Sequence, residues 1–385
     1  MVPSSWSENK LSELCEKIAV GLAISVTPYM RSAGTKLIRN QNIKRNFFNT
    51  KSVVYIDHEF AEKNKSKKVY SGDVVAVRTG SNIGEACVVP KEFDGALTFT
   101  TLIARPIPAK LSSEFLGLHI NSERGISEVN RLSAGGGKPN LNSGELKNYK
   151  LLTPPIGEQH KIAKILSTWD KAICATERLV DNSKEQKKSL MQQLLTGRKR
   201  LLDDSNKPFE GEWEIKHVSE IATIRKGKAL SSKNLELGDY PVIAGGKTSP
   251  YKHSQYTNEK VITISASGAY AGFVAYHENK IWASDCSVVK ENECTDIQFI
   301  YQYLLLNQQK IYSFQSGGAQ PHIYPKDIDA LKLRVPNITE QQKIASVLTN
   351  ADKEIKLLEQ QLGDLKQEKK ALMQQLLTGK RRVKI

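Results

Sequence analysis

The 385-residue sequence contains no long hydrophobic run. No segment approaches the ~20 consecutive apolar residues that a helix needs to cross a bilayer. The first residues, "MVPSSWSENK", also lack the apolar core of a signal peptide. We therefore expect neither a membrane span nor export, and predict a cytoplasmic protein.

Cysteine is scarce, and its spacing excludes two kinds of site. The cysteines are scattered, with no CxxC pair and no histidine cluster nearby: Cys15, Cys87, Cys174, Cys286 and Cys294. A disulfide framework and a zinc site both require closer spacing. The sequence predicts reduced thiols and no bound metal.

Catalytic motifs are also missing. "AGGKTS" (Ala244–Ser249) ends like a phosphate-binding loop, but the leading glycine of that pattern falls on Pro241. "TPPI" (Thr153–Ile156) resembles the Asn-Pro-Pro-aromatic motif of DNA amino-methylating enzymes, yet it lacks both the amide and the aromatic ring. No nuclease-type Asp/Glu-x-Lys cluster stands out. We expect no catalytic residues and no cofactor in this chain.

Positive charge is abundant. The formal net charge is +15 and the pI is about 9.4. Basic side chains displace condensed counterions from a phosphate backbone, so this balance favours a nucleic-acid partner. The length allows two or three domains, each with a core of its own.

One segment of the chain is repeated. "LMQQLLTG" occurs as Leu190–Gly197 and again as Leu372–Gly379, 182 positions apart. "EQ-x-KIA-x-x-L" begins at Glu158 and again at Glu340, at the same offset. Both copies end at a glycine, the usual stop of a helix. The repeat therefore predicts two equivalent long helices.

Mostly apolar residues in each copy recur at alternating steps of four and three, from Ile162 to Leu194 and from Ile344 to Leu376, and the first seam is weakened by Thr176 and Ser183. This heptad seam needs a second helix to bury it, and pairing the two copies satisfies both seams. The pattern does not fix the direction, but the long connection between the copies permits antiparallel pairing, which we predict. Lys187 and Lys369 interrupt the seams at equivalent positions, where we expect the packing to loosen. Thr339 is the expected cap of the second helix.

The remaining segments alternate apolar and polar residues between glycines, as half-buried strands do. One longer amphipathic stretch, Asp296–Phe314, is expected to be a helix. The predicted class is α+β: two globular domains with mixed sheets, separated by two long helices paired as an antiparallel coiled coil, with an internal pseudo-two-fold repeat. The predicted boundaries are a first globular domain at 1–157, a long helix at 158–197, a linker at 198–212, a second globular domain at 213–339, a second long helix at 340–379 and a basic tail at 380–385.

Polar loops supply the candidate DNA contacts. "IRNQNIKRN" (Ile38–Asn46) gathers Arg, Asn, Gln and Lys, and these side chains read base edges or bind phosphates. "VRTGSNIG" (Val77–Gly84) and "ISASGAYAG" (Ile264–Gly272) are turns of small residues whose amides can approach a DNA backbone. Each loop could equally be a solvated turn. The candidate residues of the first domain are Lys36, Arg39, Asn40, Gln41, Asn42, Lys44, Arg45, Arg78, Thr79, Ser81, Asn82 and Lys138. Those of the second are Lys247, Thr248, Ser265, Ser267, Tyr270, Gln320 and His322.

Taken together, these motifs resemble the specificity (S) subunit of type I DNA restriction–modification enzymes. The likeness is carried by the two "EQ-x-KIA-x-x-L" and "LMQQLLTG" copies, by "SGGAQPHIYPKDI" and by "ITISASGAYAGFVAYHENKIWASDCS". It implies two target-recognition domains, each reading one half of a split double-stranded DNA target, and helices that set the spacing. It also implies docking of two methyltransferase (modification) subunits, with restriction/translocase subunits in the full complex. S-adenosylmethionine, ATP and Mg would belong to those partners.

Two other interpretations stay open from the residues alone. One is a self-contained DNA-modifying enzyme with its own target domain. The other is a coiled-coil assembly scaffold whose basic charge is incidental.

Overall fold

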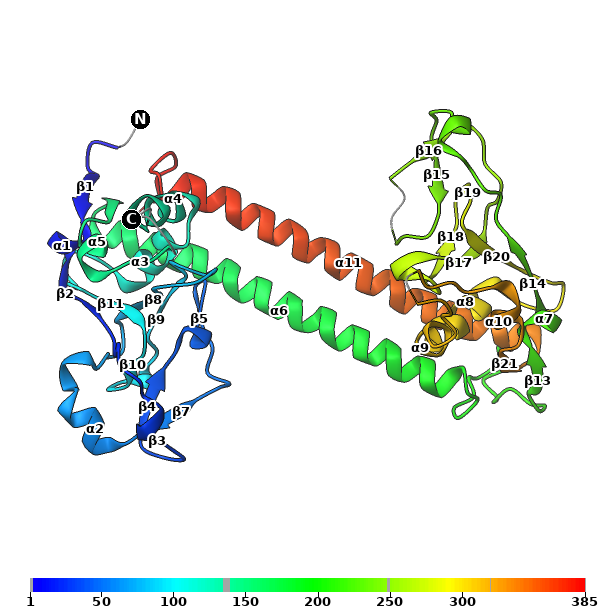
Figure 1. The fold of residues 1–385 in the computed structure, drawn as a ribbon, viewed down its shortest axis with the longest axis horizontal. Helices are drawn as coiled ribbons and strands as arrows, with labels where there is room; N and C mark the ends of the chain where they lie inside the picture. Colours follow the sequence, from blue (N-terminus) through cyan, green and yellow to red (C-terminus); the bar gives the residue numbers. More distant parts are fainter. Residues whose placement is uncertain (1–2, 134–138, 248–249, 319, 385) are drawn as a thin grey trace. The chain divides into compact units, whose positions relative to one another are not determined.

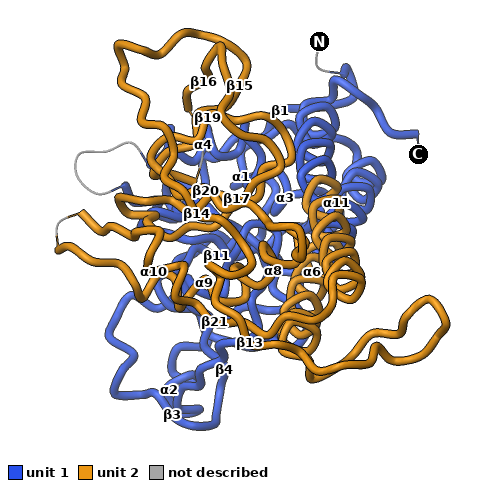
Figure 2. Tube along the Cα trace, turned by 90° about the vertical axis from the view of Figure 1, so that its right-hand side faces the viewer, with its two compact units in different colours: residues 1–175, 362–385 blue, residues 176–361 orange. Residues whose placement is uncertain are grey.

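The computed structural model describes residues 3–133, 139–247, 250–318 and 320–384. The chain forms two compact units, which are coloured separately in Figure 2. Unit 1 comprises Met1–Ala175 and Leu362–Ile385, and unit 2 comprises Thr176–Gln361. Each unit therefore contains part of both long helices, α6 (Ile156–Leu194) and α11 (Ile338–Leu376) (Figure 1). Among the described residues, no helix is both long and apolar enough to cross a bilayer.

Unit 1 is built mainly from short strands. They are β1 (Ser7–Lys10), β2 (Cys15–Val20), β3 (Met30–Arg31), β4 (Thr35–Ile38), β5 (Ile43–Lys44), β6 (Phe47–Phe48), β7 (Val54–Ile56), β8 (Val74–Val77), β9 (Ala86–Val88), β10 (Leu97–Thr98), β11 (Thr101–Pro106) and β12 (Lys150–Thr153). Its short helices are α1 (Leu11–Leu14), α2 (His58–Lys63), α3 (Ser113–Ile120), α4 (Glu123–Ser133) and α5 (Ser143–Lys147).

Unit 2 has fewer elements in a similar order. Its strands are β13 (Glu214–His217), β14 (Ala222–Lys226), β15 (Tyr240–Ile243), β16 (Lys252–His253), β17 (Val261–Ser265), β18 (Val274–His277), β19 (Trp282–Ala283), β20 (Cys286–Glu291) and β21 (Lys332–Val335). Its short helices are α7 (Val218–Ile221), α8 (Ile297–Leu306), α9 (Gln308–Tyr312) and α10 (Pro325–Asp329). The predicted single helix over Asp296–Phe314 is therefore two helices, because α8 ends at its C-cap Asn307.

The two units share one topology despite their different sequences. Each has an antiparallel four-stranded sheet, in the order β2-β11-β8-β9 in unit 1 and β14-β20-β17-β18 in unit 2. Each also has a terminal strand pair, β1–β12 or β13–β21, and a parallel pair, β4–β10 or β15–β19. The predicted mixed sheets and internal repeat are confirmed.

Each core is anchored by a largely apolar helix that packs on the four-stranded sheet. Side chains of Ser112 and Asp296 cap α3 and α8 by accepting hydrogen bonds from the N–H groups of Phe115 and Phe299. Both phenylalanine rings are fully buried. Such capping satisfies a backbone donor that would otherwise be unpaired at the helix start.

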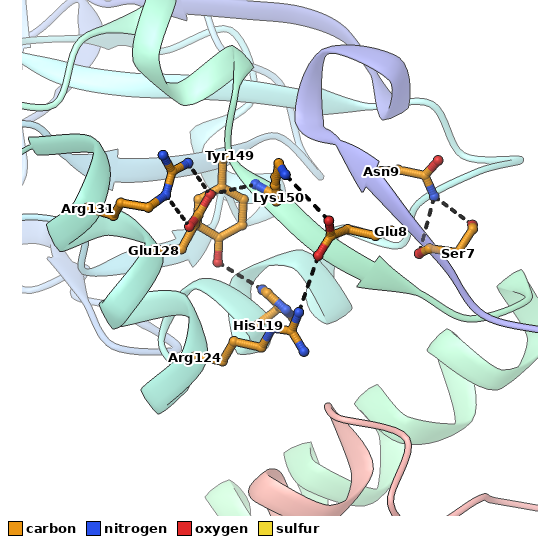
Figure 3. A network of polar contacts seen from close by, with 9 residues as sticks. All are labelled: Ser7, Glu8, Asn9, His119, Arg124, Glu128, Arg131, Tyr149 and Lys150. Carbon is orange, nitrogen blue, oxygen red and sulfur yellow. Dashed lines mark hydrogen bonds and ion pairs between the residues drawn. The ribbon is translucent and has the colours of Figure 1, made fainter. Parts of the chain in front are cut away.

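A buried histidine lies in the core of unit 1. His119 Nδ1 and the Tyr149 hydroxyl are 2.8 Å apart, and both side chains are fully buried (Figure 3). Burial lowers the pKa of His119 to about 3, because the charged imidazolium loses its hydration there. The imidazole is therefore neutral in the folded protein at physiological pH.

The long helices pair antiparallel, as the repeat predicts. In unit 1, Lys369 bonds to Asp170, and residues near the start of α6 share a hydrophobic core with residues near the end of α11. In unit 2, Lys187 bonds to Asp352 at 2.6 Å, and the end of α6 shares a core with the start of α11. The higher-numbered residue of α6, Lys187, therefore faces the lower-numbered residue of α11, Asp352, as antiparallel pairing requires. The two ion pairs are the same interaction repeated at the offset of 182.

Two details of the helix prediction are wrong. Lys187 and Lys369 do not loosen the seam, since each side chain is largely buried and bonds to an aspartate on the facing helix. Thr339 is not the cap of α11, because the helix already begins at Ile338. The Asn337 side chain accepts the hydrogen bond from Glu340 N at 2.9 Å instead. Asparagine is among the residues that most favour this position.

The repeated Glu-Gln pair has a structural role in each unit. Glu158 is fully buried, accepts a hydrogen bond from Trp6 Nε1 at 3.1 Å and forms a two-pronged ion pair with Arg382. Glu340 makes the same contacts with Trp213 and Arg200 in unit 2. The segment that follows one long helix therefore bonds to the start of the other.

Candidate nucleic-acid interface

Two polar loops lie side by side in unit 1. The β8–β9 turn is bonded to the segment before α5: Leu141 N donates to Arg78 O, and Arg78 Nε donates to Asn140 Oδ1, each at 3.1 Å. Thr79 and Asn140 form an isolated bridge between the two loops. Thr79, Ser81 and Asn82 are exposed at the turn.

Unit 2 repeats this arrangement. The β17–β18 turn is bonded to the segment before α10, through Gly268 N to Pro321 O and Ile323 N to Ala266 O, both at 3.0 Å. Ser267 and His322 form the bridge between the loops. The loops that the sequence singled out separately therefore come together at the same place in both topologies.

Glycines allow these turns to form. Gly84 and Gly272 end the two turns with φ of +80° and +90°. A Cβ at Gly84 would lie 2.7 Å from Val129 Cγ1, and one at Gly272 would lie 2.6 Å from Ile323 Cδ1. Both positions therefore require glycine for conformation and for space.

The predicted loop Arg39–Arg45 divides into buried and exposed residues. Asn42 is fully buried; its Oδ1 accepts from Arg39 N, and its amide nitrogen donates to Asn49 O at 2.9 Å. The prediction that Asn42 reads a base is therefore wrong, since its side chain holds the loop together. Gln41, Lys44 and Arg45 are exposed, and Arg45 lies 3.4 Å from Glu85 at the end of the β8–β9 turn.

Three further candidates of unit 1 are half-buried. Lys36 donates to Glu92 O and lies over the Phe93 ring, 4.9 Å from its centroid. Arg39 and Asn40 each keep a buried polar atom, Nε and Oδ1, without a partner among the described residues. An unpaired buried polar atom costs about 1–3 kcal/mol, so a bound partner that reached these two atoms would remove that cost.

The candidates of unit 2 also differ in exposure. Ser265 is buried in strand β17, so the prediction that it contacts DNA is wrong. Ser267 donates to the Asp285 carboxylate. Lys247 lies over the exposed ring of Tyr270, with Nζ 5.0 Å from the ring centroid, and Gln320 is exposed. Lys138 and Thr248 lie outside the described residues.

The structure adds residues that the sequence did not single out. A cavity of about 440 Å³ beside the loop pair of unit 2 is lined by Lys226, Asp285, His322 and Tyr324 among others. His322 and Tyr324 are stacked, and Lys226 lies 5.9 Å from the Tyr324 ring centroid. The run "RKGK" at 225–228 could have indicated this cation in the sequence, because it places three basic residues at the end of strand β14.

This arrangement suits nucleic acid. Cations that project from loops bind phosphates, exposed amides and hydroxyls form hydrogen bonds with base edges, and aromatic faces pack on bases or sugars. The described residues hold no group of three His, Cys, Asp or Glu side chains placed to bind a metal.

Comparison with known proteins identifies the family. The family model for the type I restriction modification DNA specificity domain matches residues 3–181 and 210–367, which is most of the chain. The chain belongs to this family. One match falls in each half of the internal repeat.

Relatives and solved structures agree with that assignment. The chain is 23% identical to a putative type I restriction enzyme specificity subunit of Methanocaldococcus jannaschii, over 100% of this chain and 95% of the relative. It is 25% identical to a second specificity subunit of that organism, over 83% of this chain and 82% of the relative. The crystal structure of a type I restriction–modification S subunit from M. genitalium has the same fold, with a TM-score of 0.70 at 17% identity, covering 98% of this chain and 96% of that one.

Proposed function

We propose that this chain is the DNA-sequence-recognition subunit of a type I restriction–modification complex. Each unit carries one recognition domain that reads one half of a split target in double-stranded DNA. The paired helices set the number of unspecified base pairs between the halves and provide the docking sites for methyltransferase subunits. The chain itself does not catalyse the reaction.

One observation carries this proposal. Two domains of the same topology and different sequence present the same pair of polar loops, while the helices attached to them are nearly identical at their ends. Different loops on one scaffold suit the reading of two different sequences, and a duplicated scaffold suits two copies of one partner.

The partners and cofactors follow from this role. We propose two methyltransferase subunits, one for each long helix, and restriction/translocase subunits in the full complex. S-adenosylmethionine, ATP and Mg are assigned to those partners. The cytoplasmic location and the domain boundaries given above remain predictions.

The decisive experiment is to map methylated adenines. The chain is expressed with its methyltransferase subunits in a host without other modification systems, and the genome is sequenced for methylated bases. We expect one split motif. Replacing unit 2 residues Tyr240–Ile328 with the equivalent segment of another family member should change one half of the motif and leave the other intact. Methylation without a motif, or a change in both halves, would contradict the proposal.

Loop variants locate the reading residues. Replacing Arg39 with Ala should weaken binding of the target by about 1–3 kcal/mol if it contacts a base, and relax the sequence at that position. Replacing Lys44 should instead weaken binding to all sequences equally. The buried Asn42 serves as the structural comparison, since its loss should lower stability rather than change the motif.

The two alternatives have separate tests. A self-contained modifying enzyme would bind a methyl donor as an isolated chain, and calorimetry with S-adenosylmethionine measures this. A scaffold with incidental charge would leave the reconstituted complex without sequence-selective, salt-dependent DNA binding.

A further inference from the structure

Unit 1 contains a strongly basic cavity apart from the loop pair. Its volume is about 670 Å³, and it lies where the last turns of α11 meet the start of α4 and the residue after β5. Six basic residues and one acidic residue line it: Arg45, Arg124, Lys366, Lys369, Lys370, Lys380 and Glu123. The lining therefore carries an excess of five positive charges.

Several ion pairs of these cations are weak ones. Lys370 lies 2.9 Å from Glu123, with side chains 67% and 56% exposed, and Arg45 lies 3.4 Å from Glu85. Arg124 reaches Glu8 at 3.4 Å, as Figure 3 shows. The pairs Lys370–Glu123 and Arg124–Glu8 are exposed on both sides and contribute about 0–1 kcal/mol each, so a more highly charged anion can displace them. Lys369 differs, because it is largely buried and holds Asp170 on the facing helix.

We propose that this cavity binds the phosphate backbone of the target DNA, independently of sequence. Arg45 connects the cavity to the candidate interface, because it belongs to the loop Arg39–Arg45 and contacts Glu85, which lies between the β8–β9 turn and β9. Arg45 is therefore shared by the candidate interface and the cavity lining. The inference rests on the proposed function.

The lining favours phosphate over a protein surface. Interfaces between proteins are depleted of lysine and enriched in aromatic side chains at their centres. Here four of the lining residues are lysines and none of the described ones is aromatic. Lysine is a flexible point charge that suits the irregular approach of successive phosphates.

The test uses the complex reconstituted with its methyltransferase subunits. The variant Lys366→Gln/Lys370→Gln removes two exposed charges from the cavity and keeps good helix-forming residues. The matched control Lys353→Gln/Lys356→Gln removes two exposed charges from the same helix, outside the residues that line the cavity. Binding is measured at several salt concentrations, with a duplex that carries the mapped motif and with a scrambled duplex.

We expect the cavity variant to lower the slope of log affinity against log salt by about 0.9 for each phosphate that the complex no longer neutralises, for both duplexes alike. The methylated motif should not change, and Lys366→Arg/Lys370→Arg should retain the original slope. A slope equal to that of the control would overturn the proposal. So would failure of the methyltransferase subunits to assemble in sedimentation, since the cavity would then take an acidic protein surface. A wild-type complex that does not discriminate the two duplexes would instead refute the proposed function.

Discussion

Removing the Arg382 guanidinium should destabilise unit 1, although Arg382 lies close to the end of the chain, beyond α11. Its Nε and Nη2 lie 2.6 and 2.9 Å from the two carboxylate oxygens of Glu158, whose side chain is fully buried. In Arg382→Ala the buried carboxylate keeps only the hydrogen bond from Trp6 Nε1 among those described.

The size of the effect follows from this burial. Loss of one partner from a buried ion pair costs about 3–5 kcal/mol, because it leaves an uncompensated charge. The Arg382 side chain is 45% exposed, so water can reach the site and the cost falls to about 2–3 kcal/mol. For a unit of about 200 residues, each kcal/mol lowers the melting temperature by roughly 2–4 °C. We expect a decrease of about 4–12 °C.

Calorimetry of the full chain measures this decrease, and hydrogen exchange should localise it to unit 1. Arg381→Ala is the matched control, since Arg381 is the exposed neighbour with the same charge; it should change stability by less than about 0.5 kcal/mol. The double variant Glu158→Gln/Arg382→Ala removes the unpaired charge and should recover part of the loss. If Arg382→Ala melts like wild type, or if Arg381→Ala loses as much, the reasoning is refuted.

Three further predictions concern the helices and the core. Leu348→Glu places a charge on a fully buried seam position and should destabilise unit 2 by about 4 kcal/mol. Leu357→Glu, at a position 67% exposed on the same helix, should have little effect. Equal midpoints of urea unfolding for the two variants would argue against the seam. His119 has a pKa of about 3 in the folded protein and about 6.5 in the unfolded chain. Below pH 6.5 the unfolded chain therefore binds a proton that the folded protein does not, and the free energy of unfolding falls by roughly 1.4 kcal/mol at pH 5.5. His119→Asn should therefore flatten the dependence of the melting temperature on pH between about 7.5 and 5.5, and an unchanged slope would show that other groups cause it. One heptad is inserted about five residues after Asp170, and another about five residues before Lys369, so that both helices become about 10 Å longer and stay in register. The methylated motif should then gain about three unspecified base pairs between its two halves. An unchanged number of unspecified base pairs would mean that the spacing is set elsewhere.

The candidate site could be predicted only in part. The sequence pointed to the loops that the fold brings together in each unit, because glycine-rich turns and clusters of polar residues are local signals. It could not separate Asn42, which is buried, from Lys44, which is exposed, because burial depends on the partners that the fold brings to each side chain. The cation at Lys226 was missed for the same reason: only the folded sheet places it beside His322 and Tyr324.

What the sequence determined by itself was the repeat and its consequences. A heptad seam repeats every few residues, so it can be recognised along the chain. Two seams at one offset specify two equivalent helices whose apolar faces pack on each other. Tertiary structure decided the contacts that lack any local period. Arg382 is 224 residues from Glu158, and Arg200 is 140 from Glu340, so neither ion pair leaves a pattern along the chain. The strand order that the two four-stranded sheets share was likewise not predicted, because many combinations of apolar side chains fill the same sheet and helix.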